Sequence, residues 1–325
     1  MNRSFYLGID VGSSKTHAVL ADAAGRLVGF GESGPGNHES VGYPGLTHVL
    51  SESFNQACAA AGGSPAQVGE AGFGISGLDW PAQRAHMLKC IASLGLAGPV
   101  EAVNDAILGL LAGTAEGWGV ALVSGTGCNC WGWDQARSRI GRVTGGGSLM
   151  GEAAGGSELV EAALRAVSHA WTGRGPATSL SQALASAAGA AGPEDLLEGL
   201  MDGRYRLHAH AAPRVFEAAY AGDEVALGLV RWAGSELGEL AKAVIRQLHF
   251  EALDFELVMI GSMFRGGRLL VEALDESVHA LAPGARLAPL NAPPVVGAVL
   301  LGMEQGGLHP DAALRAKLIE SFRTV

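Results

Sequence analysis

Two apolar runs that each lead into a loop of glycine and hydroxyl residues are the clearest feature of the hydrophobic pattern. The first run covers residues 5–10 and passes through the loop 11–15 into another apolar run at 16–21. The same order returns about 114 residues later, where 120–123 leads through the loop 124–127 into a further run. Each set predicts a β-hairpin. Their recurrence predicts a duplicated fold.

Apolar residues at steps of three and four predict helices between the strands. We expect helices at 41–62, 80–94, 157–171, 223–250, 268–281 and 295–304, and further strands at 71–75, 100–103, 129–133 and 257–260. The helix at 80–94 is expected to begin behind Asp79 as its N-cap, with Pro81 in its first turn. Strands that alternate with helices favour an α/β fold over an all-α fold.

The length of 325 residues predicts about two domains. We expect an N-terminal domain over residues 1–112 and a C-terminal domain over 113–309, each beginning with one of the two hairpins. A terminal helix is expected within 310–325. Whether that helix packs back on the N-terminal domain is left open by the sequence.

Composition and charge narrow the class of function. The chain has 22 Lys and Arg against 32 Asp and Glu, a formal net charge of −10, which argues against a nucleic-acid or membrane-surface partner. No apolar stretch reaches transmembrane length and no signal-peptide pattern precedes the first strand, so we expect a cytoplasmic protein. Glycine, with 49 residues, is about twice as frequent as usual, which predicts tight turns and loops that approach a ligand closely.

Several sequence patterns resemble metal, disulfide or dinucleotide sites but give only weak evidence for them. The four cysteines, Cys58, Cys90, Cys128 and Cys130, include no CxxC pair and are expected to be reduced thiols. Cys128 and Cys130 could form a metal pair, but no second pair has matching spacing. The segment 72–77 fits GxGxxG, yet its first two glycines fall inside a predicted strand, which argues against a dinucleotide site.

The stronger chemical signal lies where the predicted strands end. Asp10 stands at the root of the first glycine and hydroxyl loop, where a carboxylate can hold Mg²⁺ through water while backbone N–H groups bind phosphate oxygens. Asp105 also follows a strand, and such a carboxylate can accept a hydroxyl proton during phosphoryl transfer. The alternative is that Asn104 and Asp105 cap the helix at 106–111, and the two roles do not exclude each other.

The order of these motifs resembles the N-acetylglucosamine kinase / BadF-type ATPase family. The matching segments are Leu7-Gly-Ile-Asp10-Val-Gly12-Ser-Ser-Lys15-Thr16, Ser76-Gly77, Asn104-Asp105-Ala106, Leu122-Val-Ser124-Gly125-Thr126-Gly127, Gly145-Gly-Gly-Ser-Leu-Met-Gly151-Glu152, Gly261-Ser262-Met263 and Pro293-Pro294-Val-Val-Gly297-Ala298. The resemblance implies two RNase-H-like domains of the actin-like ATPase type, each with a mixed β-sheet flanked by helices, around an interdomain ATP cleft.

The resemblance also implies roles for individual residues. ATP and Mg²⁺ would be bound by Asp10 (the Mg²⁺ through water), Gly12, Ser13, Ser14, Lys15, Thr16, Ser124, Gly125, Thr126, Gly127, Gly261 and Ser262. A small sugar substrate would be bound by Asn37, His38, Ser76, Gly77, Asp105, Gly145, Gly146, Gly147 and Glu152. Asp105 would be the catalytic base. A homodimer is left open.

These features favour an ATP-dependent kinase that phosphorylates the 6-hydroxyl of N-acetylglucosamine or a close amino sugar. Two departures from the family pattern, Gly146 in place of Trp and Ala153 in place of an acidic residue, concern the sugar pocket, so glucosamine is an alternative substrate. A second alternative is an ATPase activator of a dehydratase, which would need a thiolate-ligated iron–sulfur cluster. A third is an ATP-binding regulator without kinase activity.

Overall fold

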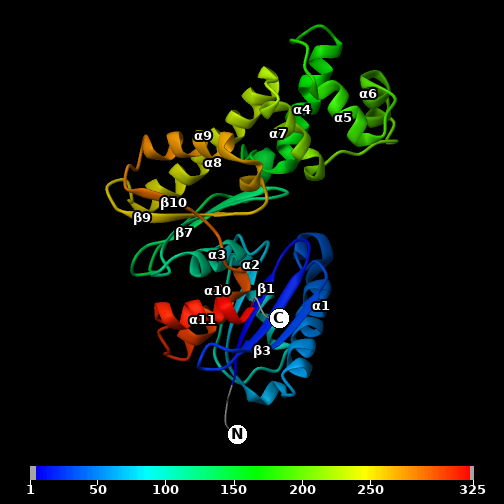
Figure 1. The fold of residues 1–325 in the computed structure, drawn as a ribbon. Coiled ribbons are helices and arrows are strands. Elements are labelled where there is room, and N and C mark those ends of the chain that lie inside the picture. The colour runs from blue at the N-terminus through cyan, green and yellow to red at the C-terminus, as the bar shows by residue number, and fades with distance from the viewer. Residues whose placement is uncertain (1–4, 323–325) are drawn as a thin grey trace. The chain divides into compact units, whose positions relative to one another are not determined.

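The computed structural model describes residues 5–322 and divides the chain into two compact units (Figure 1). The first unit combines the chain up to Ala121 with Gly132–Ser138 and the part from Ala288 onward, and the second combines Leu122–Trp131 with Arg139–Leu287. This division differs from the expected boundaries, because the helix that follows Pro293 belongs to the first unit. Among the described residues no helix is long and apolar enough to cross a bilayer.

The first unit is built on a mixed five-stranded sheet with the order β3-β2-β1-β4-β5. Its strands are β1 (Phe5–Val11), β2 (Thr16–Ala21), β3 (Leu27–Ser33), β4 (Val68–Ile75) and β5 (Val100–Val103). β1 and β2 form the predicted antiparallel hairpin, whereas β1, β4 and β5 are parallel. The carboxyl ends of these three parallel strands therefore meet at one edge of the sheet, which is where ligands bind in open α/β sheets.

Helices cover both faces of this sheet (Figure 1). They are α1 (His38–Ala60), α2 (Pro81–Ala92), α3 (Asp105–Gly113), α10 (Pro294–Gln305) and α11 (Ala312–Phe322). The core on one face joins α1 and α2 to the strands, through buried side chains such as Phe54 and Met87. The core on the other face joins α10 and α11, through Val299 and Leu318. The terminal helix thus packs within the first unit, where the Ser321 hydroxyl accepts from the backbone N–H of Leu27.

Part of the glycine surplus serves helix packing and not loops. A Cβ on Gly8 of β1 would lie 2.5 Å from the Val299 nitrogen, and one on Gly72 of β4 would lie 2.2 Å from the Ala298 oxygen. These strands can therefore approach the α10 backbone only because they carry no side chain there. Two glycines of the GxGxxG match at 72–77 therefore lie within β4 and serve helix packing: Gly72 faces α10, and a Cβ on Gly74 would lie 2.2 Å from the Leu108 side chain of α3.

The second unit contains most of the other five-stranded sheet, with the order β10-β9-β6-β7-β8. Its strands are β6 (Gly119–Ser124), β7 (Cys128–Trp133), β8 (Ile140–Arg142), β9 (Phe255–Ile260) and β10 (Ala285–Pro289). The second predicted hairpin, β6 and β7, is present. β3, β8 and β10 were not expected from the hydrophobic pattern.

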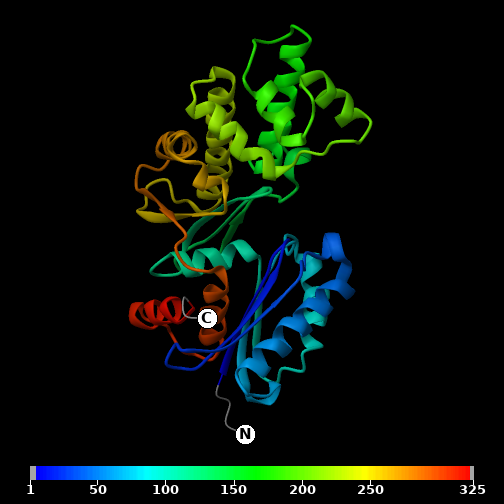
Figure 2. The same cartoon turned by 45° about the vertical axis from the view of Figure 1, so that its right-hand side comes forward.

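Helices make up the rest of the second unit (Figure 2). They are α4 (Gly156–Trp171), α5 (Leu180–Ala188), α6 (Pro193–Met201), α7 (Ala212–Tyr220), α8 (Glu224–Leu248) and α9 (Arg268–His279). α4, α8 and α9 agree with the predicted helices, whereas α5 to α7 lie in a stretch that was expected to be mainly helical but for which no separate helices were predicted.

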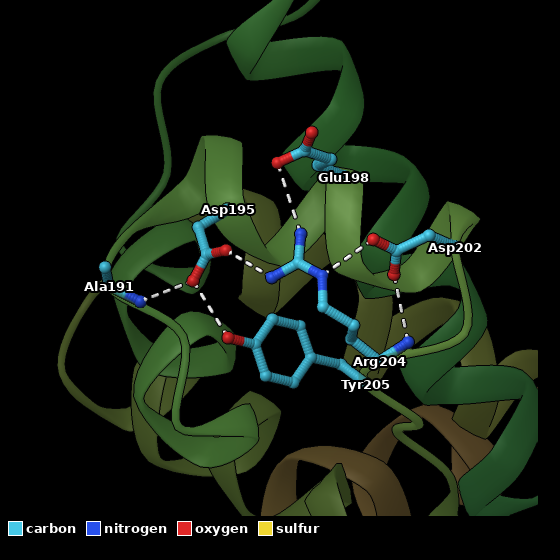
Figure 3. A network of polar contacts seen from close by, with 6 residues as sticks. All are labelled: Ala191, Asp195, Glu198, Asp202, Arg204 and Tyr205. Carbon is cyan, nitrogen blue, oxygen red and sulfur yellow. Dashed lines mark hydrogen bonds and ion pairs between the residues drawn. The ribbon is translucent and has the colours of Figure 1, made fainter.

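A polar network links α6 to the residues that follow it (Figure 3). The Arg204 guanidinium pairs with Asp195, Glu198 and Asp202, and the Tyr205 hydroxyl donates to Asp195 at 2.9 Å. Hydrogen bonds from Arg204, then from the Ala191 N–H and Tyr205, lower the pKa of Asp195 to about 2. The ion pairs are largely exposed, so this network fixes the local chain path more than it adds to global stability.

Candidate functional site

The loop between β1 and β2 forms a closed turn at the carboxyl edge of the first sheet. The Gly12 N–H donates to the Lys15 carbonyl at 2.9 Å, and the Gly36 N–H donates to the Gly12 carbonyl at 3.0 Å. Ser13, Ser14 and Lys15 are exposed at its tip. The loop therefore offers hydroxyl groups and a cation at the edge where the parallel strands end.

Thr16 and Lys15 have different surroundings within that loop. The Thr16 side chain is fully buried and donates to the Gly34 carbonyl at 3.0 Å, so it braces the loop from beneath. The Lys15 side chain is 60% exposed, and its ammonium nitrogen lies 4.0 Å from a carboxylate oxygen of Glu32. A pair this exposed is weak, which leaves Lys15 able to turn toward an anion.

Two carboxylates with raised pKa values lie at this edge. Burial, then the nearby Asp105 charge, raises the pKa of Asp10 to about 7, against the opposing effect of Lys15. Burial, then the charge of Asp79, raises the pKa of Asp105 to about 7, although hydrogen bonds from backbone N–H groups and the Ser76 side chain lower it. A carboxyl group that titrates near neutral pH in such a place is suited to accept a proton.

A hydroxyl bridge connects the first loop to Asp105. The Ser13 and Ser76 hydroxyl oxygens are 3.1 Å apart, and the Ser76 side chain also hydrogen-bonds to the Asp105 carboxylate. The Ser76 backbone N–H donates to the Val11 carbonyl at 2.9 Å, which fixes this position. Ser13, Ser76 and Asp105 are thereby brought together from three separate parts of the sequence.

The structure separates the two roles that were left open for Asn104 and Asp105. Asn104 is the N-cap of α3, and its side-chain oxygen accepts from the Ala106 N–H at 3.0 Å. Asp105 is the first residue of the helix. The Asn104 amide therefore caps the helix, and the Asp105 carboxylate is not needed as the N-cap.

The expected sugar residues of the first unit also meet at this edge. Asn37 is the N-cap of α1, where it accepts from the Glu39 N–H at 2.9 Å. A Cβ on Gly77, which has a φ of +83°, would lie 2.7 Å from the Asn37 side-chain oxygen and 3.0 Å from His38 Nδ1. His38 Nδ1 is buried and has no hydrogen-bond partner in the described part of the chain. Its ring stacks on Tyr43, with centroids 4.9 Å apart.

The second glycine loop has an open backbone. The Gly125 N–H donates to the Gly127 carbonyl at 2.9 Å, and the loop carbonyls of Gly125 and Thr126 accept from Gly156 and Ser157 at the start of α4. A Cβ on Gly125 or Gly127 would meet no atom within 4 Å. The Ser124 side chain, by contrast, is buried and donates to the Ala154 carbonyl at 2.8 Å. The exposed part of this loop is therefore its glycines and Thr126.

A cavity of about 830 Å³ opens beside this loop within the second unit. Its walls include Gly125, Ser262 and His210 of the short turn Ala209–Ala211. Phe216 and Tyr220 of α7 and Arg265 of the turn Met263–Gly266 also line it. Gly261 has a φ of +116°, and its Cβ would lie 2.2 Å from the Ser124 carbonyl oxygen. Only glycine fits there, and it brings the 261–262 turn against the loop at 124–125.

Of this cavity, the sequence predicted Gly125 and Ser262 in the wall and Gly261 beside it, but not α7. The spacing of Pro213, Phe216 and Tyr220, at steps of three and four, is the signal that could have predicted an apolar helix face here.

Glu152 is buried, and its carboxylate contacts Thr144 at the start of the same loop. It is only 5% exposed, and Oε1 accepts from the Thr144 N–H at 2.6 Å and from the Thr144 hydroxyl at 2.7 Å. Oε2 has no partner among the residues that the structure describes. Glu152 thus braces the turn that carries Gly145, Gly146 and Gly147 (the last within the turn Gly147–Met150).

Gly146 lies against the side chain of Met150. A Cβ on Gly146 would lie 2.4 Å from Met150 Cγ. Leu149 and Met150 are 86% and 61% exposed. This turn therefore presents exposed apolar side chains next to Gly146.

Three of the cysteines, Cys58, Cys90 and Cys130, are buried, and Cys128 is partly buried. Burial raises the pKa of Cys128 to about 11, and burial raises that of Cys130 further above its usual value. Cys128 Sγ accepts from the Ala154 N–H at 3.4 Å. Residues 5–322 contain no group of three or more His, Cys, Asp or Glu side chains arranged to hold a metal.

Comparisons with known proteins cover nearly the whole chain. The model of the BadF/BadG/BcrA/BcrD ATPase family matches residues 7–302. The chain is 28% identical over 317 residues to a protein from Dictyostelium discoideum named N-acetyl-D-glucosamine kinase, with coverage of 93% of this chain and 99% of that one. It is 25% identical over 303 residues to the N-acetylmuramic acid/N-acetylglucosamine kinase of Clostridium acetobutylicum, with the same coverage.

A solved structure supports the predicted fold class. A Chromobacterium violaceum protein, provisionally named an N-acetylglucosamine kinase, superimposes with a TM-score of 0.69 at 22% identity, covering 92% of this chain and 98% of that one. At this identity the likeness shows the fold alone. The fold class predicted from the motifs, two α/β units with flanking helices, is thereby confirmed.

Proposed function

Because this chain belongs to the BadF/BadG/BcrA/BcrD ATPase family, we propose that it is a sugar kinase that transfers the γ-phosphoryl group of ATP to the 6-hydroxyl of N-acetylglucosamine or a close amino sugar. The observation that carries the proposal is the hydroxyl bridge from Ser13 through Ser76 to Asp105. It joins a loop suited to phosphate to a carboxylate suited to a proton, which are the two groups that phosphoryl transfer to an alcohol requires. The names of the relatives point to the same substrate class.

Each loop then has a defined task. The loops 12–15 and 125–127 bind phosphate oxygens through backbone N–H groups and through the hydroxyls of Ser13, Ser14 and Thr126. The cavity beside Ser262 takes the adenosine. Asp105 orients the sugar hydroxyl and accepts its proton as the new O–P bond forms. With its pKa raised to about 7, it can release the proton again near neutral pH.

The residues present fit a magnesium ion at Asp10. Its carboxylate is partly buried at the root of the first loop, and oxygen ligands of this kind suit Mg²⁺ bound through water. The ion would neutralise the charge of the transferring phosphoryl group. A bound cation would also favour the ionised form of Asp10, whose pKa is otherwise raised by burial and by Asp105.

The orientation of Glu152 supports the acetylated sugar over glucosamine. A free ammonium group would be favoured by an open carboxylate, but the Glu152 carboxylate is buried against Thr144. His38 and Asn37, beside Gly77, offer polar atoms for an acetamido group or a hydroxyl. The proposal therefore ranks N-acetylglucosamine first.

The other classes have less support. An activator with an iron–sulfur cluster would need accessible thiolates, whereas burial raises the pKa of Cys58, Cys128 and Cys130. A regulator without kinase activity would have no need of a carboxylate held near neutral pKa beside a phosphate loop.

A coupled ADP-release assay over a panel of hexoses and amino sugars tests the proposal. We expect ADP release that depends on N-acetylglucosamine, and a fall in kcat of about 10²- to 10⁴-fold in Asp105→Asn with sugar binding retained. Asp311→Asn, on an exposed turn before α11, is the matched control and should keep normal turnover. ADP release that no sugar stimulates, or normal turnover in Asp105→Asn, would contradict the proposal.

A further inference from the structure

The charge of Asp79 raises the pKa of the proposed base Asp105, and Asp79 also holds Asn104, the residue that precedes that base. The Asn104 side-chain nitrogen donates to Asp79 Oδ1 at 3.0 Å, and Asn104 is only 2% exposed. The oxygen of the same amide accepts from the Ala106 N–H at 3.0 Å. Both ends of a buried amide are therefore engaged, one by Asp79 and the other by the first turn of α3.

The segment that carries Asp79 is itself fixed. The Gln83 side-chain oxygen accepts from the backbone N–H groups of both Asp79 and Trp80, at 2.9 and 2.7 Å. Trp80, and not Asp79 as expected from the sequence, occupies the N-cap position of α2. The Asp79 backbone is thus held by Gln83, while its carboxylate accepts from Asn104.

We propose that Asp79 is a positioning residue: its carboxylate orients the Asn104 amide, and that amide sets the first turn of α3, which presents Asp105 to the sugar hydroxyl. The inference rests on the proposed function for its kinetic consequence. Its structural part, the dependence of the first turn of α3 on the Asp79 acceptor, stands independently.

Two properties of the arrangement support a positioning role. Asp105 is the first residue of α3, so any change in the cap angle moves its carboxylate directly. The Ile107 N–H also donates to the Asn104 carbonyl, so the whole first turn depends on how Asn104 is held. A displacement of about 1 Å between reacting groups can cost about 10²-fold in rate.

A pair of variants separates the hydrogen bond from the charge. Asp79→Asn keeps an oxygen that can accept from Asn104, whereas Asp79→Ala removes it. We expect kcat for the sugar to fall about 10- to 100-fold in Asp79→Ala, with KM for ATP unchanged, and to stay within about threefold of wild type in Asp79→Asn at pH 8. Glu101→Gln is the matched control, because Glu101 of β5 pairs with Arg84 of α2 but makes no contact with Asn104 among the described bonds.

Amide hydrogen exchange measures the same effect without catalysis. The Ala106 and Ile107 amides should exchange faster in Asp79→Ala than in wild type, and at the wild-type rate in Asp79→Asn and Glu101→Gln. Equal losses of kcat in the Asn and Ala variants, or unchanged exchange at Ala106 in Asp79→Ala, would overturn the proposal. If the wild-type protein phosphorylates no sugar, the proposed function fails, and the exchange measurement still decides whether Asp79 positions α3.

Discussion

Gly261 offers the sharpest test of how the nucleotide side of the site is built. Its φ of +116° lies outside the region that side chains adopt readily, and an added Cβ would lie 2.2 Å from the Ser124 carbonyl oxygen and 3.2 Å from the Gly125 nitrogen. Backbone strain of this kind costs about 1–3 kcal/mol, and overpacking against backbone costs about 1–3 kcal/mol more. Together they predict a destabilisation of about 2–6 kcal/mol in Gly261→Ala if the turn keeps its position.

The turn can instead move away from the loop at 124–125, which shifts the loss from stability to ATP binding. We therefore expect Gly261→Ala either to lose stability within that range or to bind ATP at least about tenfold more weakly, with sugar binding unchanged. Urea unfolding and calorimetric titration with a non-hydrolysable ATP analogue measure the two quantities. Gly189→Ala is the control, because Gly189 has a φ of +74° and no atom within 4 Å of its Cβ. If Gly261→Ala matches Gly189→Ala in both measurements, the contact with Ser124 does not shape the site.

Two further predictions concern stability. The pKa values of Asp10 and Asp105 are raised to about 7 each in the folded chain, whereas carboxyl groups of the unfolded chain titrate near pH 4. The folded chain therefore keeps these protons over a pH range in which the unfolded chain has released them. This contribution to the free energy of unfolding is full below about pH 4 and is lost as the pH rises through about 7. Asp105→Asn should therefore melt at a higher temperature than wild type at pH 8, without nucleotide or Mg²⁺, and show little difference at pH 4; a lower melting temperature at pH 8 would refute the sign. Gly8→Ala should lower the free energy of unfolding by about 1–3 kcal/mol because its Cβ meets the α10 backbone, whereas Gly34→Ala, with open space around it, should not; equal urea midpoints for the two variants would refute this.

The local pattern was sufficient for the elements that start the two units. The hairpins and the long helix α8 follow from short-range alternation and periodicity, and the predicted cap at Asn104 is present. β3 was missed because two of its seven residues are glycines. A Cβ on Gly29 or Gly31 would lie 2.1 Å from a carbonyl oxygen of α1, so the reason for those glycines is a contact distant in sequence.

The same limit applies to the candidate site. Asp10, Ser76 and Asp105 could be predicted to lie at one edge, because Asp10 is near the end of β1, the other two follow β4 and β5, and these strands are parallel. The direction of Glu152 could not, since nothing in the local sequence decides between a carboxylate that faces a ligand and one that accepts from Thr144. The role of Asp79 was also missed, because its position before Pro81 resembles an ordinary helix cap.

The packing of α10 against Gly8 and Gly72 has a consequence for how the chain acquires its structure during synthesis. β1 and β4 leave the ribosome early, but the helix that covers their bare backbone is encoded more than 200 residues later, at Pro294–Gln305. The first unit thus cannot complete its core until the C-terminal part of the chain has been made, whereas the segment Arg139–Leu287 has all its helices in one stretch. A truncation that removes α10 would consequently expose β1 and β4, which are synthesised first. A chaperone would then bind an incomplete sheet in the first unit and not only a disordered C-terminus.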